Sequence, residues 1–249
     1  MFSPNGIKTV LFDLDGTLRL HLPAGGEIFT NYVIRLGYPI SQEDHLRSER
    51  WEHYYWANSP ELKSDHDVYG GETRDFWRNY SRRRLIALGI APAIAFDLAE
   101  RVSNYMEENY RPQTLVPEGA ISVLQNLQDA GYRLAVVSNR TNPYTDELER
   151  LGLASFFEFA LAGGEVNFYK PQPGIFAAAL QRLDSPPHQA IYVGDNYFAD
   201  VIGARQAGLW PVLYDPRGLF SEAGCPVMTS FTELFLILAE ISSITEKGE

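Results

Sequence analysis

Two rhythms of hydrophobic and polar residues divide the chain. Short runs of consecutive apolar residues, many of them β-branched or aromatic, have the length and composition of buried strands at 7–13, 133–139, 157–162, 190–195 and 210–215. Apolar residues recur at helical spacing in the segments 118–130, 143–151, 173–183, 198–207 and 231–242. Continuous apolar strands that alternate with helices are typical of a parallel sheet covered on both faces. We therefore predict an α/β fold with a doubly wound, Rossmann-like parallel sheet.

The stretch between residues 21 and 115 shows helical periodicity alone. We predict helices over 27–36, 42–57, 71–88 and 92–109, with Ser41 and Asp44 resembling a capping box at one helix start. The segments LHLPAGG (20–26) and RPQTLVPEG (111–119) are rich in Pro or Gly and bracket these helices. The pattern predicts a helical domain, 21–115, inserted into an α/β core domain made of 1–20 and 116–249.

Composition narrows the class of protein. A chain of 249 residues with 45% hydrophobic residues can bury a core and still carry an insertion. No stretch approaches the ~20 apolar residues of a membrane span, and a secretory leader is not evident, so we expect no membrane partner and a cytoplasmic location.

The cysteine count and the net charge exclude further classes. The one cysteine, Cys225, rules out a disulfide framework, and we expect it to pack as a small near-apolar residue. The net charge of −11 disfavours nucleic acid as a partner but not a small anion held in a local cleft.

Polar residues stand where three predicted strands end. Asp13 and Asp15 interrupt the apolar run VLFDLDGTL, Ser138 and Asn139 close RLAVVSN, and Asp195 closes AIYVGD. Ligands of an open parallel sheet bind beyond the carboxyl ends of its strands. We therefore expect these side chains to meet at one site, with Ser138 and Asn139 binding substrate there rather than serving as helix caps.

These residues suit phosphoryl transfer. A carboxylate that approaches a phosphate dianion to about 4 Å at an effective dielectric near 20 meets a repulsion of about 8 kcal/mol. Mg²⁺ and a lysine can offset that repulsion, and the chain offers Asp195 as a metal carboxylate and Lys170 in YKPQPGIF. Asp13 is then the candidate nucleophile, and Asp15 the candidate general acid and base.

The blocks DLDGT, VVSN, KPQPGIF and GDNYFAD, in this order, resemble the haloacid dehalogenase superfamily of phosphohydrolases. The resemblance spans residues 7–215 and is to the branch with a helical cap after the first strand. It implies Asp13 as nucleophile, Asp15 as general acid and base, Ser138 as phosphate ligand and Lys170 as the neutralising lysine. It also implies Mg²⁺ held by Asp13, the backbone carbonyl of Asp15 and Asp195, with Asp200 ordering Lys170 or a metal-bound water. A glycine often precedes the lysine in this superfamily; here Tyr169 does.

The resemblance leaves several activities open. Members that displace halide from carbon lack the second aspartate, so Asp15 favours phosphoryl chemistry. Members that cleave carbon–phosphorus bonds use a cap lysine, and Lys63, the one lysine between the linkers, lies in a polar stretch unsuited to that role. We predict hydrolysis of a small phosphorylated metabolite: a sugar phosphate, a phosphoglycolate-like ester or a nucleotide. A phosphomutase remains the alternative, and a silent binding module is less favoured. The oligomeric state, Mg²⁺ against Mn²⁺ and the physiological substrate stay open.

Inside the predicted cap, ordinary structural roles are favoured. Trp51 and Tyr55 stand one helical turn apart and are predicted to pack in the cap core rather than stack on a substrate. Four-residue spacing places three arginines on one helix face, which we expect to be solvated rather than to bind an anion: Arg74, Arg78 and Arg82. We predict SDHD, 64–67, as an exposed loop rather than a metal cluster, and assign no role to His21.

Overall fold

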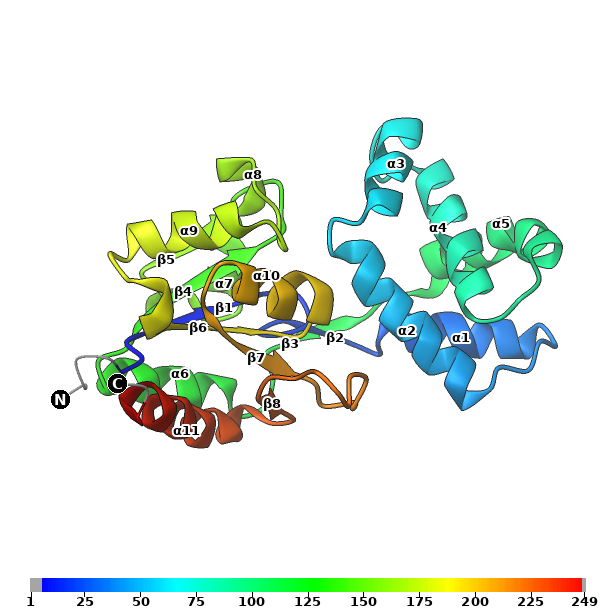
Figure 1. Ribbon diagram of the computed structural model, residues 1–249. Coiled ribbons are helices and arrows are strands. Elements are labelled where there is room, and N and C mark those ends of the chain that lie inside the picture. Colours follow the sequence, from blue (N-terminus) through cyan, green and yellow to red (C-terminus); the bar gives the residue numbers. More distant parts are fainter. Residues whose placement is uncertain (1–5, 248–249) are drawn as a thin grey trace. The chain divides into compact units, whose positions relative to one another are not determined.

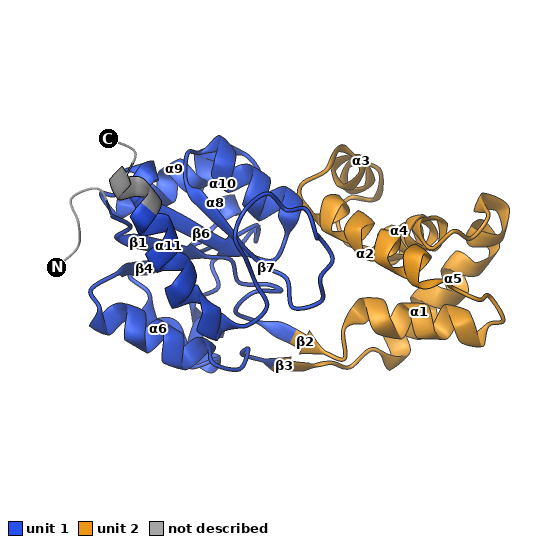
Figure 2. Cartoon of the chain, turned by 60° about the horizontal axis from the view of Figure 1, so that its bottom comes forward, with its two compact units in different colours: residues 1–20, 115–249 blue, residues 21–114 orange. Residues whose placement is uncertain are grey.

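The computed structural model describes residues 6–247, and the chain forms two compact units. Figure 2 colours the unit that comprises the chain up to Leu20 and from Leu115 onward in blue, and His21–Thr114 in orange. The outer ends of the predicted catalytic core, 1–5 and 248–249, lie outside the described residues. A short sheet of β2 (Leu20–Leu22) and β3 (Gln113–Leu115) joins the two connections between the units.

The first unit is built on a six-stranded parallel sheet with strand order β5-β4-β1-β6-β7-β8. Its strands are β1 (Thr9–Phe12), β4 (Arg133–Ser138), β5 (Phe159–Ala162), β6 (Ala190–Gly194), β7 (Trp210–Tyr214) and β8 (Val227–Met228). Five of them lie within the predicted runs, and the short edge strand β8 was not predicted. The predicted α/β fold with a parallel sheet is confirmed, and β1 lies near the middle of the sheet (Figure 1).

Helices cover both faces of this sheet. They are α6 (Ala120–Asp129), α7 (Thr145–Arg150), α8 (Gly163–Val166), α9 (Pro173–Arg182), α10 (Ile202–Gln206) and α11 (Leu234–Lys247). The apolar side chains of α6 and α11 pack with one face of the sheet, whereas α9 and α10 pack with the other (Figure 1). No helix among residues 6–247 is long and apolar enough to span a membrane.

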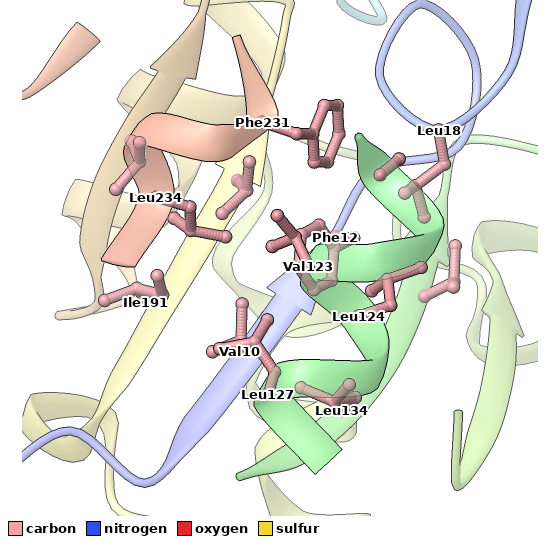
Figure 3. Close-up of a cluster of buried hydrophobic side chains, with 14 of the residues drawn as sticks. Val10, Phe12, Leu18, Val123, Leu124, Leu127, Leu134, Ile191, Phe231 and Leu234 are labelled. Atoms are coloured by element: carbon pink, nitrogen blue, oxygen red, sulfur yellow. The ribbon is translucent and has the colours of Figure 1, made fainter. Parts of the chain in front are cut away.

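Alternation along each strand explains the two layers. Successive side chains of a strand point to opposite faces. Val10 and Phe12 therefore join the core under α6 and α11, as Figure 3 shows, while Leu11 joins the core under α9. Because both faces of β1 are buried, its sequence reads as one apolar run rather than as an alternating pattern.

The second unit is entirely helical apart from residues of the short sheet. Its helices are α1 (Gly25–Arg35), α2 (Gln42–Trp56), α3 (Pro60–Tyr69), α4 (Arg74–Ala87) and α5 (Pro92–Asn109). The predicted capping role of Ser41 is confirmed, since its hydroxyl accepts the backbone N–H of Asp44 at 3.1 Å. Four of these helices follow the predicted segments within three residues at each end.

Helix α3 corrects the prediction of an exposed loop at 64–67. Ser59 caps its start by accepting the backbone N–H of Leu62 at 3.1 Å, Pro60 occupies the first turn, and Gly70 ends it in the left-handed conformation. Asp65 points inward and accepts both Nε and Nη2 of Arg83 at 2.8 Å. The acid is thus neutralised by an arginine in the interior of the helical unit.

The aromatic residues of α2 pack as predicted. Tyr55 is fully buried, and its ring centroid lies 5.1 Å from that of Trp51. The three arginines spaced along α4 contact polar residues within the helical unit: Arg74 with Asn104, Arg78 with Asp75, and Arg82 with the buried Asn79. Such contacts fit the predicted solvated face.

Candidate active site

Three adjacent strands end at the edge of the sheet that carries the polar residues. β1 pairs with β4 on one side and β6 on the other, with Phe12 opposite both Val136 and Val193. Asp13, Asn139 and Asp195 directly follow these strands. Parallel register therefore brings Asp13 together with residues that lie more than a hundred positions later in the sequence.

The ammonium group of Lys170 lies at the centre of the site. It donates to Asp13 Oδ1 at 2.5 Å, to Asp200 Oδ1 at 2.7 Å and to the Tyr192 hydroxyl at 2.9 Å. An ammonium has three protons, so these acceptors use all of them. Lys170 is only 2% exposed, and the Tyr192 hydroxyl donates its hydrogen bond to the carbonyl of Val137 at 2.7 Å.

The acids outnumber the cation. Asp13, Asp195 and Asp200 each offer a carboxylate oxygen within 4.8 Å of the others. Burial, together with repulsion from the neighbouring acids, outweighs the attraction of Lys170 and raises the pKa of Asp13 to about 7. The same causes raise the pKa of Asp195 well above its usual range. A compact set of hard oxygen donors with excess negative charge fits a divalent cation such as Mg²⁺.

Two glycines let the backbone approach these acids. Gly16 has φ +93°, and a Cβ there would overlap the carboxylate of Asp195. A Cβ on Gly194 would overlap the carboxylate of Asp200. Thr17, fully buried, donates to Asp195 Oδ1 at 3.2 Å, so the DLDGT turn and the end of β6 fit directly against each other.

A π-helix positions Asp200. Residues Tyr197–Val201 form this single wide turn after Asn196, whose side-chain oxygen accepts the N–H groups of Phe198 and Ala199, both at 3.0 Å. Asp200 Oδ2 accepts the N–H of Asn196 at 2.9 Å, and its other oxygen accepts from Lys170. Such turns occur often at functional sites because they redirect one side chain.

Ser138 and Asn139 differ in their surroundings. Ser138 is 3% exposed and is the last residue of β4. The Asn139 amide is engaged with the Lys170 backbone: its oxygen accepts the N–H at 2.6 Å, and its NH₂ donates to the carbonyl at 2.9 Å. This pair of bonds fixes the loop that carries the lysine.

Asp15 is more exposed than the acids around Lys170, with a side chain that is 40% exposed. Arg140 donates to both of its carboxylate oxygens, at 2.9 and 3.0 Å, and Arg19 approaches Oδ1 at 2.6 Å. Sequence reasoning missed Arg140 and Tyr192. Arg140 directly follows Asn139, and Tyr192 is a hydroxyl in an otherwise apolar strand, which are the two signals available in the sequence.

Comparison with known proteins agrees with this geometry. The pattern of the haloacid dehalogenase-like hydrolases matches residues 7–208. The chain is 35% identical over 215 residues to ribulose-1,5-bisphosphate 5-phosphatase of Halopiger xanaduensis, covering 83% of this chain and 84% of that one. It is 29% identical over 219 residues to glyceraldehyde 3-phosphate phosphatase of Methanothermobacter thermautotrophicus, covering 83% and 85%.

A solved structure supports the fold. A predicted phosphoglycolate phosphatase from Haemophilus somnus superposes with a TM-score of 0.59 at 20% identity, covering 93% of this chain and 97% of that one. The match spans both the sheet and the helical insertion. The family match covers most of the chain, and the order of the motifs and the fold agree with it. The chain therefore belongs to the haloacid dehalogenase-like hydrolases.

Proposed function

We propose that the chain is a metal-dependent phosphatase that hydrolyses a small phosphate monoester. The observation that carries this proposal is the buried contact of Lys170 with Asp13 and Asp200 beside Asp195, a site with excess negative charge. Relatives named as phosphatases of small phosphorylated metabolites add support. The helical unit, 21–114, is proposed to act as the cap that contributes substrate selection.

Asp13 is proposed as the nucleophile. One of its carboxylate oxygens attacks phosphorus, a P–O bond to the alcohol breaks, and an aspartyl-phosphate forms. Lys170 keeps the attacking side chain oriented and offsets part of the charge that gathers on the phosphoryl oxygens. The lysine is in turn held by Asp200, by Tyr192 and, through its backbone, by Asn139.

Asp15 is proposed as the proton carrier. It donates a proton to the leaving oxygen as that oxygen departs, and takes a proton from the water that then attacks phosphorus and frees Asp13. Ser138 is proposed to donate its hydroxyl to a phosphoryl oxygen, a role allowed by its place at the end of β4.

The donor set suits Mg²⁺, which would be held by the carboxylates of Asp13 and Asp195 and the backbone carbonyl of Asp15. When bound, this ion supplies positive charge to the phosphoryl group and so reduces the repulsion between the substrate and Asp13. Asp200, already engaged with Lys170 and the Asn196 amide, is proposed to orient the lysine rather than to bind the ion directly.

A phosphate-release screen over sugar phosphates, nucleotides and phosphoglycolate tests the proposal. We expect release with Mg²⁺, loss of activity with a chelator, and loss of at least a thousandfold in Asp13→Asn, since the nucleophile is removed. The matched control is Asp67→Asn, an exposed acid of α3. Activity that survives chelation or the Asp13 substitution contradicts the mechanism, and an isomerised sugar phosphate in place of free phosphate would identify a mutase.

A further inference from the structure

A closed ring of charges surrounds Asp15. Arg140 donates to both oxygens of the Asp15 carboxylate, and Arg19 binds one of them. Both arginines also donate to Glu147 of α7. Two guanidinium groups thus face two carboxylates, and all four residues belong to the same unit of the chain. The ring is partly shielded, with the side chains of Arg19 and Arg140 19% and 24% exposed.

Arg140 is anchored to the interior of the sheet. Its guanidinium carbon lies 5.3 Å from the ring centroid of Tyr144, which is 4% exposed. The Tyr144 hydroxyl is placed to donate to the carbonyls of Val136 on β4 and Leu161 on β5, at 3.2 and 3.1 Å. The Arg140 guanidinium is therefore held by Asp15 and Glu147 and by the ring of Tyr144. That ring is itself fixed by its hydroxyl against β4 and β5.

We propose that Arg140, oriented by Glu147, is a positioning residue that holds Asp15 where it can exchange a proton with the leaving oxygen. This inference rests on the proposed phosphatase function. An aspartate that is 40% exposed on a turn would otherwise sample several rotamers, and proton transfer requires it within hydrogen-bond reach of the reacting oxygen. A guanidinium that binds both carboxylate oxygens fixes the plane of that group, which a single point charge does not do.

The proposal predicts a dependence on the leaving group. An alkyl alcohol leaves phosphorus as a strong base and needs the proton from Asp15, whereas p-nitrophenolate leaves without it. The constant kcat/KM covers the steps up to departure of the leaving group, so it isolates this proton transfer. Damage to the positioning of Asp15 should therefore slow one substrate and spare the other.

The test compares glycerol phosphate, or whichever alkyl phosphate the screen selects, with p-nitrophenyl phosphate. In Arg140→Met, kcat/KM should fall about 100-fold for the alkyl ester, in line with loss of general acid catalysis, and by less than about threefold for p-nitrophenyl phosphate. Arg140→Lys should recover little, because lysine cannot bind both oxygens of Asp15. Arg150→Met, an exposed arginine of α7, is the matched control and should change neither constant.

A double substitution completes the test. Once Asp15→Asn has removed the proton carrier, adding Arg140→Met should cause no further loss on the alkyl ester. Equal losses on both substrates, or a full additional loss in the double variant, would overturn the positioning role. If Arg140→Met melts early by circular dichroism, Glu147→Gln takes its place and must show the same substrate dependence. A wild-type chain without activity on either ester would instead reject the phosphatase proposal.

Discussion

Among single residues, Lys170 has a large expected effect on the free energy of unfolding. Its ammonium is buried and saturated by three acceptors, and the two carboxylates among them raise its pKa well above the ordinary value despite the opposing effect of burial. A group whose folded pKa is raised contributes stability that is present below its unfolded pKa. Lys170 itself therefore stays charged across the neutral range, and its own titration removes this contribution only in strong alkali.

Replacing this lysine should destabilise the metal-free protein. Lys170→Met leaves Asp13 and Asp200 buried without their cation, and we expect the free energy of unfolding to fall by about 3–5 kcal/mol at pH 8. Urea titration followed by circular dichroism measures the change. Lys63→Met, an exposed lysine of α3, is the control and should lie within about 0.5 kcal/mol of wild type. Equal stability of the two variants would refute a structural role for the Lys170 contacts.

The sequence predicted which residues meet at the sheet edge, but not which contacts they make there. Asp13, Asp195 and Lys170 could be placed at one sheet edge because strand ends and motif order are encoded locally. Two contacts depend on which side chains meet across adjacent strands. One is the pair of hydrogen bonds from Arg140 to Asp15, and the other is the hydrogen bond from Lys170 to the Tyr192 hydroxyl. Register and rotamer, rather than residue type, decide those pairs.

At the scale of elements, the connection from β6 to the π-helix determines where Asp200 lies in the site. Gly194 ends the strand, and Asp200 reaches back to it from the wide turn. A methyl group on Gly194 would occupy the place of the Asp200 carboxylate. This close packing links a backbone position to the acid that orients Lys170.

Gly194→Ala should therefore impair both stability and catalysis. Forcing Asp200 aside costs about 1–3 kcal/mol by overpacking, and the loosened lysine should lower kcat/KM for phosphate release at least tenfold. Gly25→Ala is the control, because the nearest atom to a Cβ there is 3.4 Å away and its backbone is helical. A Gly194→Ala enzyme with wild-type kinetics would mean that Asp200 tolerates displacement.

The helical unit has its own buried charge network. Arg84 binds Glu49 at 3.0 Å and Glu52 at 2.6 Å, and both Arg84 and Glu49 are 2% exposed. Burial acts to raise the pKa of Glu52, but the charge of Arg84 and the Tyr80 hydroxyl outweigh it and lower that pKa. A carboxyl with a lowered folded pKa contributes stability above its unfolded pKa and loses it as the pH falls.

Arg84→Met should consequently destabilise the helical unit by about 3–5 kcal/mol at pH 7, since it leaves the buried Glu49 and the partly buried Glu52 without their cation. The loss should shrink towards pH 4, where Glu52, once unpaired, takes up a proton. Arg78→Met removes only an exposed pair with Asp75 and serves as the control, with an expected change under about 1 kcal/mol. Thermal melts at the two pH values measure both effects, and a pH-independent loss would argue against charge as its cause.

Elements with clear hydrophobic periodicity were predicted well, whereas helix α3, which lacks it, was not. Helix α3 was missed because charged residues fill its sequence and hide the apolar face. Its inward positions include an acid, Asp65, whose burial is made possible by Arg83 from the neighbouring helix. No count of apolar residues along the chain reveals such a pair.

On the scale of the whole molecule, the borders of the two compact units fall inside the segments LHLPAGG and RPQTLVPEG. These segments are where the sequence changes from alternating strands and helices to helices alone. Composition thus locates the passage between units. The first unit places several acids close together at its sheet edge. The rest of the chain does not offset their negative charge, because the net charge is −11.

Divalent cations should therefore stabilise the whole protein in a pH-dependent way. Burial, opposed by Lys170, raises the pKa of Asp13 from 3.8 to about 7, so without metal the folded state binds more protons than the unfolded state between these values. Metal-free stability should consequently fall as the pH rises through this window. Mg²⁺ competes with those protons, so its affinity should rise about tenfold per pH unit below pH 7 for one displaced proton.

The measurement is the shift of the melting temperature by Mg²⁺ at pH 5.5 and pH 8. At pH 8 and about 100 times the dissociation constant, Mg²⁺ should add about 2.7 kcal/mol to the free energy of unfolding, and the same concentration at pH 5.5 should add much less. Asp195→Asn should abolish most of the shift because it removes a proposed ligand, whereas Asp67→Asn should preserve it. Equal shifts at both pH values would show that Mg²⁺ binds elsewhere, since surface carboxylates are already ionised at pH 5.5.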